Sequence, residues 1–145
     1  MRYFAYGSNM DLVQMDGRCP GACVVGPARL PGYRLGFVTD ETGYDGGVAT
    51  IVPDPASEVY GVLWEIDDTH LAALDEWETY PVAYRRHTIT VHAPEPVEAL
   101  VYVANFSSPE PPSDRYLDVI LRGLRDNGIG PEYASLIRRL AGRDG

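Results

Sequence analysis

Short apolar runs, separated by glycine, proline and polar clusters, dominate the first two-thirds of the chain. Runs of this length that are rich in Val, Ile, Leu and Tyr predict β-strands. The strands expected on this basis are Arg2–Tyr6, Ala22–Leu30, Tyr33–Val38, Val48–Val52, Glu58–Ile66, Tyr84–Val91 and Val97–Ala104. The pattern therefore predicts six or seven strands.

Turn-forming residues mark the boundaries between these strands. Pro31-Gly32 is expected to separate two of them, and Thr39–Gly47, which is polar and glycine-rich, is expected to be a loop. Pro53–Ala56 is predicted to be the turn of a hairpin formed by the strands on either side of it. Ser107–Pro112 contains three prolines and is predicted to be a stiff, irregular connection.

Helical spacing appears in the remaining segments. A short helix is expected to begin near Asn9, with Ser8 or Asn9 as its N-cap. Asp67-Asp68 offers an N-cap for a helix from about Thr69 to Trp77 or Glu78.

The last third of the chain predicts a pair of helices. Ser113 caps the first of them, which ends at Gly128, and Pro131 begins the second. The apolar residues expected to face inward are Leu117, Ile120, Leu121, Leu124, Leu136, Ile137 and Leu140. Strands interrupted by one helix and followed by two more predict a single α+β domain over residues 1–145.

Charge and composition narrow the classes of function. The 145 residues include 12 basic and 21 acidic side chains, which gives a net charge of -9. A nucleic-acid-binding protein needs a cationic surface, so no nucleic-acid partner is expected. No run approaches the ~18 apolar residues of a membrane span, and the first residues enter a strand pattern without a signal peptide, so we expect a cytoplasmic protein with no membrane partner.

Cysteine and histidine do not suggest a metal site. Cys19 and Cys23 are spaced C-P-G-A-C, which differs from the C-x-x-C of redox and zinc sites. The three histidines lack the i, i+4 spacing of a helical metal pair. We therefore expect no metal and no obligatory disulfide.

Glu78 is the unusual residue of the predicted middle helix. At about 100° per residue, Leu74 lies about 60° from Leu71, Glu78 lies about 20° from it, and Glu76 lies about 140° away. Glu78 thus falls on the apolar stripe, where burial raises a carboxyl pKa toward neutrality and suits it to acid–base catalysis. Two structural alternatives remain: the helix ends before Glu78, or the carboxylate pairs with Arg85 or Arg86.

The stretch YFAYGSNM, residues 3–10, joins an aromatic strand to a small polar turn. One interpretation is simple helix capping. The other is a binding site, in which Gly7 allows a ligand close to the backbone and successive N–H groups receive an anionic oxygen. Gly7 belongs to no G-x-G-x-x-G or P-loop pattern, so a nucleotide is not expected.

Together these segments resemble the gamma-glutamylcyclotransferase family. Its Tyr-Gly-Ser-Asn signature stands here at residues 6–9, and its Leu-Asp-x-x-Glu signature stands at residues 74–78. Gly46–Ile66 resembles the central hairpin of the family, and Pro111–Tyr133 resembles its closing loop and helices. The resemblance implies a small mixed β-barrel flanked by helices, with no cofactor.

The resemblance also implies an activity and a site. The expected reaction is attack of the substrate α-amine on the γ-carbonyl of a gamma-glutamyl amide, which releases 5-oxoproline and an amine, with Glu78 as the proton-transferring base. The substrate-binding residues expected by resemblance are Tyr3, Phe4, Ala5, Tyr6, Gly7, Ser8, Asn9, Tyr84, Tyr102 and Tyr116. For the last three tyrosines, ordinary barrel packing is an equal alternative.

The sequence leaves more than one possibility open for the leaving group, the activity and the oligomeric state. Tyr44, Asp45 and Pro109–Pro112 are candidate contacts to the leaving amine, and the substrate is a gamma-glutamyl amino acid, a gamma-glutamyl amine or a protected natural product. A catalytically silent binding module is the other class, and the protein is expected to be a monomer or a homodimer. Thr79 stands where the family usually has glycine, so a positive φ there would strain it.

Overall fold

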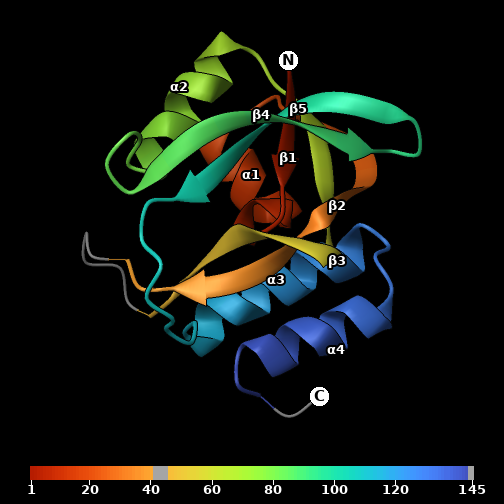
Figure 1. Cartoon of the computed structure of the whole chain (residues 1–145). Helices are drawn as coiled ribbons and strands as arrows, with labels where there is room; N and C mark the ends of the chain where they lie inside the picture. Colours follow the sequence, from red (N-terminus) through yellow and green to blue (C-terminus); the bar gives the residue numbers. More distant parts are fainter. Residues whose placement is uncertain (41–45, 144–145) are drawn as a thin grey trace.

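Five strands close into a barrel in the computed structural model, which describes residues 1–40 and 46–143 (Figure 1). They are β1 (Arg2–Ala5), β2 (Cys23–Val38), β3 (Val48–Glu65), β4 (Tyr84–His92) and β5 (Pro96–Ala104). Their order around the barrel is β1-β3-β2-β4-β5. β1 and β5 run parallel, whereas the other neighbouring strands are antiparallel. The predicted small mixed β-barrel flanked by helices is confirmed.

The prediction of six or seven strands is wrong, because two pairs of predicted strands are continuous. Pro31-Gly32 interrupts β2 only at a register shift, where Gly32 has φ +85°. Pro53–Ala56 is not a hairpin turn: β3 continues through it, and the β3 residues on both sides pair with β2. Proline and glycine mark a bulge in a strand as well as a turn, which is why the sequence pattern misplaced the hairpin.

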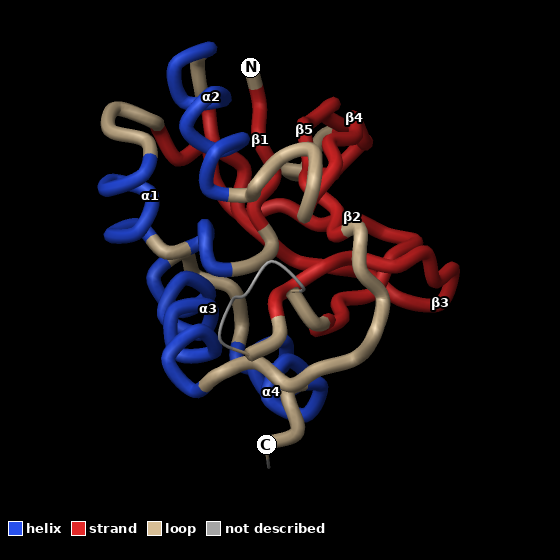
Figure 2. The backbone as a smooth tube through the Cα atoms, turned by 90° about the vertical axis from the view of Figure 1, so that its left-hand side faces the viewer, coloured by secondary structure: helices blue, strands red, loops and turns tan. Residues whose placement is uncertain are grey.

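The described helices are α1 (Leu12–Arg18), α2 (Asp68–Trp77), α3 (Asp114–Asp126) and α4 (Pro131–Leu140), preceded by a short 3₁₀ turn, η1 (Ser8–Met10). The tube view shows α1, α2 and α3 along one side of the strands (Figure 2). The predicted N-caps Asp67 and Ser113 are confirmed, since each accepts a backbone N–H of its own helix. The cap predicted near Asn9 is wrong: Asp11 caps α1 by accepting the Gln14 N–H at 2.9 Å.

A partly buried ion pair ties α3 to the end of η1. Arg122 donates from Nε and Nη2 to the two carboxylate oxygens of Asp11, at 2.6 and 2.7 Å. The helix can approach because residue 123 is glycine: a Cβ there would lie 2.7 Å from Met10 Cβ and 2.8 Å from the Asp11 nitrogen. The turn that follows β1 is therefore fixed from outside the barrel.

Two further observations concern the described residues. None of their helices is long and apolar enough to cross a membrane. Nor do three or more of their His, Cys, Asp and Glu side chains gather as a metal ion would require.

Candidate active site

A small cavity that opens to solvent lies where β1 leads into η1. The lining residues come from β1, η1, β3, β4, β5, α3 and the end of α2. They are Tyr3, Phe4, Tyr6, Gly7, Ser8, Asn9, Ala49, Glu78, Tyr84, Tyr102 and Tyr116.

The structure brings together all the predicted site residues except one. Ala5 is buried and pairs with Val62 on β3, but it does not line the cavity. Ala49 lines the cavity and was missed by sequence reasoning. It contributes its backbone N–H and C=O, as described below, and no side-chain chemistry signals such a role in a sequence.

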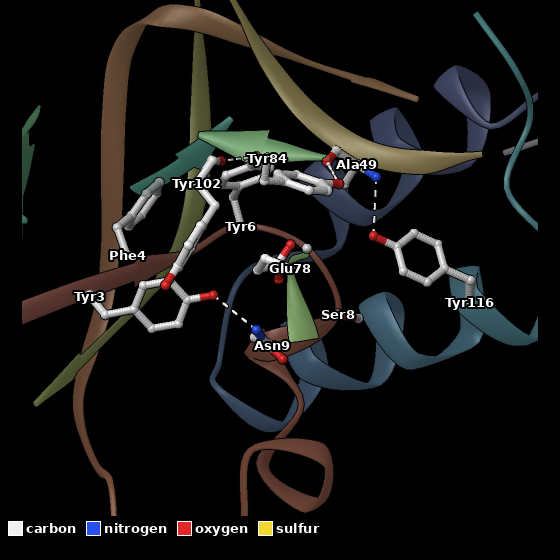
Figure 3. A pocket seen from close by; sticks show the side chains of 11 residues that line it. Tyr3, Phe4, Tyr6, Ser8, Asn9, Ala49, Glu78, Tyr84, Tyr102 and Tyr116 are labelled. Carbon is white, nitrogen blue, oxygen red and sulfur yellow. Dashed lines mark hydrogen bonds between the residues drawn. The ribbon is translucent and has the colours of Figure 1, made fainter. Parts of the chain in front are cut away.

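Glu78 projects among the lining side chains (Figure 3). The helix α2 ends at Trp77, yet the Glu78 N–H still donates to the Leu74 carbonyl oxygen at 2.8 Å, so Glu78 keeps its place on the face of the fully buried Leu74. Glu76 is exposed, as predicted. The helix therefore ends before Glu78, as one alternative held, but its end does not release the side chain to the surface.

Pairing of Glu78 with an arginine of β4 is contradicted. Arg86 lies 3.5 Å from the Asp75 carboxylate, and Arg85 donates to His87, to the Ala104 carbonyl and to the Asn105 side chain. Both guanidinium groups are thus engaged elsewhere.

Burial raises the pKa of Glu78 from its ordinary value of 4.5 to about 7. The positive charge of Arg18 opposes this change, and the negative charge of Asp40 adds to it, but both effects are smaller than that of burial. A carboxyl with a pKa near 7 is substantially populated in both protonation states at neutral pH. It can therefore accept a proton and return it.

Two tyrosines bracket the backbone of Ala49. The Tyr84 hydroxyl donates to the Ala49 carbonyl oxygen at 2.7 Å, and the Ala49 N–H donates to the Tyr116 hydroxyl oxygen at 3.1 Å (Figure 3). Burial raises the pKa of Tyr84 well above its ordinary value, so this phenol stays protonated and can donate. Both rings line the cavity and are at the same time fixed to β3.

A second pair of tyrosines links β1 to β5 and α2. Tyr6 donates its hydroxyl proton to the Tyr102 carbonyl oxygen, and the Tyr102 hydroxyl donates to Asp75 at 2.7 Å. The Tyr3 ring stacks edge-on against that of Tyr102, with 5.9 Å between centroids. Tyr102 therefore combines the two alternatives, because its ring packs in the barrel and also forms part of the cavity wall.

The Gly-Ser-Asn turn is held by side-chain hydrogen bonds. Gln14 Nε2 donates to Ser8 Oγ at 2.7 Å and to Asn9 Oδ1 at 3.0 Å, and Asn9 Nδ2 donates to the Tyr3 hydroxyl at 3.0 Å. The first N–H groups of a helical turn have no acceptor within it. A Cβ on Gly7 would lie 3.2 Å from the Ala49 Cβ, so a side chain at this position would require Ala49 to shift slightly.

Thr79 has φ 52°, in the left-handed region. This confirms the strain expected if the position required a positive φ, because a β-branched residue is a true outlier there. Its backbone closes a turn: the Thr79 N–H donates to the Glu76 carbonyl, and its own carbonyl accepts the N–H groups of Val82 and Ala83. A conformation of this kind costs about 1–3 kcal/mol.

Of the candidate contacts to the leaving group, the segment 109–112 does not line the cavity. Pro109 pairs with Val38 at the end of β2, and the Pro111 carbonyl accepts the Gly47 N–H at 2.9 Å, so the segment 109–112 supports the barrel rim. Tyr44 and Asp45 lie outside the described residues.

A closed mixed barrel whose cavity combines a carboxyl of raised pKa with a Tyr-Gly-Ser-Asn turn is suited to acid–base chemistry on a small molecule. The family model described as "Gamma-glutamyl cyclotransferase, AIG2-like" matches residues 3–119. The chain belongs to this family.

Individual relatives agree with this assignment. The chain is 34% identical over 151 residues to a gamma-glutamylcyclotransferase of Bos taurus, covering 98% of this chain and 79% of that protein. The Homo sapiens gamma-glutamylcyclotransferase is 32% identical over the same shares of the two chains. A solved structure of a gamma-glutamyl cyclotransferase superposes with a TM-score of 0.88 at 29% identity, over 99% of this chain and 88% of that one.

Proposed function

We propose that this protein is a gamma-glutamylcyclotransferase that converts a gamma-glutamyl amide into 5-oxoproline and a free amine. The α-amino nitrogen of the glutamyl group attacks its own γ-carbonyl carbon, a new C–N bond closes the five-membered ring, and the original amide C–N bond breaks. One proton leaves the attacking nitrogen and one joins the departing nitrogen, so neither water nor a cofactor is consumed. The family membership and the raised pKa of Glu78 in the cavity carry this proposal.

Glu78 is the proposed proton carrier. Its ionised form accepts a proton from the substrate α-ammonium or from the attacking amine, and its protonated form returns one to the leaving nitrogen. General acid–base catalysis of this kind contributes about 10²–10⁴-fold to the rate. Because the substrate supplies its own nucleophile, the protein needs no Ser, Cys or Thr nucleophile.

The proposed role of the Gly7-Ser8-Asn9 turn is to hold the glutamyl end. Its backbone N–H groups suit the α-carboxylate or the developing oxyanion, while the aromatic wall of Tyr3 and Tyr84 keeps the substrate curled. Holding an intramolecular reaction in a near-attack geometry supplies several kcal/mol. Ala5 contributes to this site only through its strand.

The proposal extends to the cellular compartment, the oligomeric state and the range of substrates. We infer a cytoplasmic enzyme of gamma-glutamyl and glutathione metabolism, active as a monomer or homodimer without partners other than its small substrate. The alternative substrates are gamma-glutamyl amines and protected natural products. A silent binding module is disfavoured by the fold itself, because burial of a carboxyl that does no work is a cost without a compensating gain.

A panel of gamma-glutamyl amides tests the proposal. The protein should release 5-oxoproline from at least one of them, and Glu78→Gln should lower the rate by about 10²-fold or more while ligand binding persists. Glu76→Gln, on the exposed face of the same helix, is the matched control and should retain full turnover. Binding without turnover of any compound would identify the binding module instead, and unaltered turnover in Glu78→Gln would remove Glu78 from its role.

A further inference from the structure

A second cavity adjoins the first and shares Glu78 with it. It is open to solvent, and Ser8, Glu78, Tyr84 and Tyr116 border both cavities. A substrate that places its glutamyl group in the first cavity and its reacting carbonyl at Glu78 must extend its other half elsewhere. The second cavity is the adjoining space available for it.

Arg18 is the cation of this second cavity. It is half-buried at the end of α1, donates from Nη1 to Asn9 Oδ1 at 3.0 Å, and its guanidinium carbon lies 4.4 Å from the centroid of the Trp77 ring. Among the described residues no carboxylate lies within ion-pair distance of it. A guanidinium carries five N–H donors in a fixed fork, so donors remain for a ligand.

The stacking fixes the direction of these donors. Trp77 is 58% exposed, an unusual position for so large an aromatic residue, and its ring serves as the platform on which the guanidinium lies. A planar guanidinium held on one face and hydrogen-bonded at one nitrogen presents its remaining edge in a defined orientation. That edge matches the two oxygens of a carboxylate.

Asp40 is the opposing charge at this cavity. A carboxylate ligand is repelled by Asp40 and attracted by Arg18, so the stronger influence decides. At the Glu78 carboxyl, which borders the cavity, the effect of Arg18 exceeds that of Asp40. Of these two charges, Arg18 therefore has the larger effect on a group placed next to Glu78.

We infer that Arg18, supported by Trp77, forms a subsite that selects substrates whose leaving amine carries a carboxylate next to the scissile nitrogen. This inference rests on the proposed cyclotransferase function. In a gamma-glutamyl α-amino acid only one carbon separates the scissile nitrogen from the carboxylate carbon, which keeps the negative charge close to Glu78 and hence to Arg18. An amine without a carboxylate makes no such contact, so the enzyme discriminates for amino acids and against simple amines.

Two substrates that differ only in that carboxylate test the inference. Gamma-glutamyl-L-alanine and gamma-glutamyl-ethylamide share the glutamyl half, so effects of a mutation on Glu78 or on the Asn9 turn cancel in the ratio of their kcat/KM values. Wild type should prefer the alanine compound by about tenfold or more, which is what a charged hydrogen bond supplies. Arg18→Gln should bring the ratio close to one, and Arg18→Lys, which keeps the charge but loses the fork, should retain part of it.

Arg139→Gln, an exposed arginine near the end of α4, is the matched control and should leave the ratio at the wild-type value. A wild-type ratio near one, or the same ratio in Arg18→Gln as in wild type, overturns the inference while leaving the cyclotransferase function standing. Absence of 5-oxoproline from both compounds and from the wider panel overturns the proposed function itself. If Arg18→Gln does not fold, the comparison of Arg18→Lys with wild type decides.

Discussion

Replacing Glu78 by glutamine should stabilise the fold, and it should do so only at neutral and alkaline pH. Burial raises the Glu78 pKa, so the folded state binds that proton more tightly than the unfolded chain does. The stability gained from this group is complete below its unfolded pKa and is lost as the pH rises through the folded pKa. Above neutrality the folded protein must hold a charge in a poorly solvated place, which the neutral amide of glutamine avoids.

The structure sets the size of the effect. The Glu78 pKa moves from 4.5 to about 7, a difference of about 2.5, and each unit of pKa difference corresponds to ~1.36 kcal/mol. At pH 8 the wild-type protein is therefore destabilised by ~3 kcal/mol relative to low pH, whereas at pH 5 the loss is below ~1 kcal/mol. The advantage of Glu78→Gln over wild type should grow by ~2 kcal/mol between these two pH values.

Urea unfolding at pH 5 and pH 8, followed by circular dichroism, measures this difference. Wild type, Glu78→Gln and the exposed control Glu76→Gln are compared, so that the titration of all other groups cancels. Glu76→Gln should track wild type at both pH values. An advantage of Glu78→Gln that is equal at pH 5 and pH 8 would refute the reasoning, because it would mean that the carboxyl does not titrate differently in the folded and unfolded states.

Two further substitutions probe the surroundings of the site. Thr79→Gly should raise the free energy of unfolding by about 1 kcal/mol, since relief of the positive φ exceeds the entropy cost of glycine; Thr88→Gly in β4, the control, should lower it by a similar amount, and a loss in Thr79→Gly would show that the backbone there is not strained. Asp11→Asn should lower the urea midpoint at pH 7, because it removes the buried negative charge to which Arg122 donates. Arg122 also holds the pKa of Asp11 below its usual range, so this contribution is lost as the pH falls, and an equal effect at pH 7 and pH 3 would contradict the ion-pair explanation.

The sequence was informative where a local rule and the tertiary structure coincide. Ser113 and Asp67 cap their helices because a short polar side chain before an apolar helical repeat has few better partners. Glu78 was found because its position on the apolar stripe conflicts with its charge. A charged residue on the apolar face of a helix can therefore be recognised from the sequence alone.

Other features could not be predicted, because contacts between residues distant in the sequence determine which of several local structures forms. Pro53–Ala56 has the composition of a turn, but the partner strand β2 runs past it and absorbs it as an irregularity. The residue that caps α1 is Asp11 and not Ser8 or Asn9. The Asn9 side-chain amide instead forms hydrogen bonds with Tyr3, Gln14 and Arg18. Ala49 acts through its backbone N–H and C=O, and a pattern of side-chain types carries no information about such a role.

The pH dependence of 5-oxoproline release tests the central claim most directly, that Glu78 carries the proton. With gamma-glutamyl-L-alanine as substrate, kcat/KM of the wild-type protein should rise with pH along an acid limb whose midpoint is about 7, because only the ionised carboxylate acts as a base. In Glu78→Gln the limb should disappear and the rate should fall by about 10²–10⁴-fold. An acid limb that persists in Glu78→Gln, at a rate close to wild type, would contradict the account.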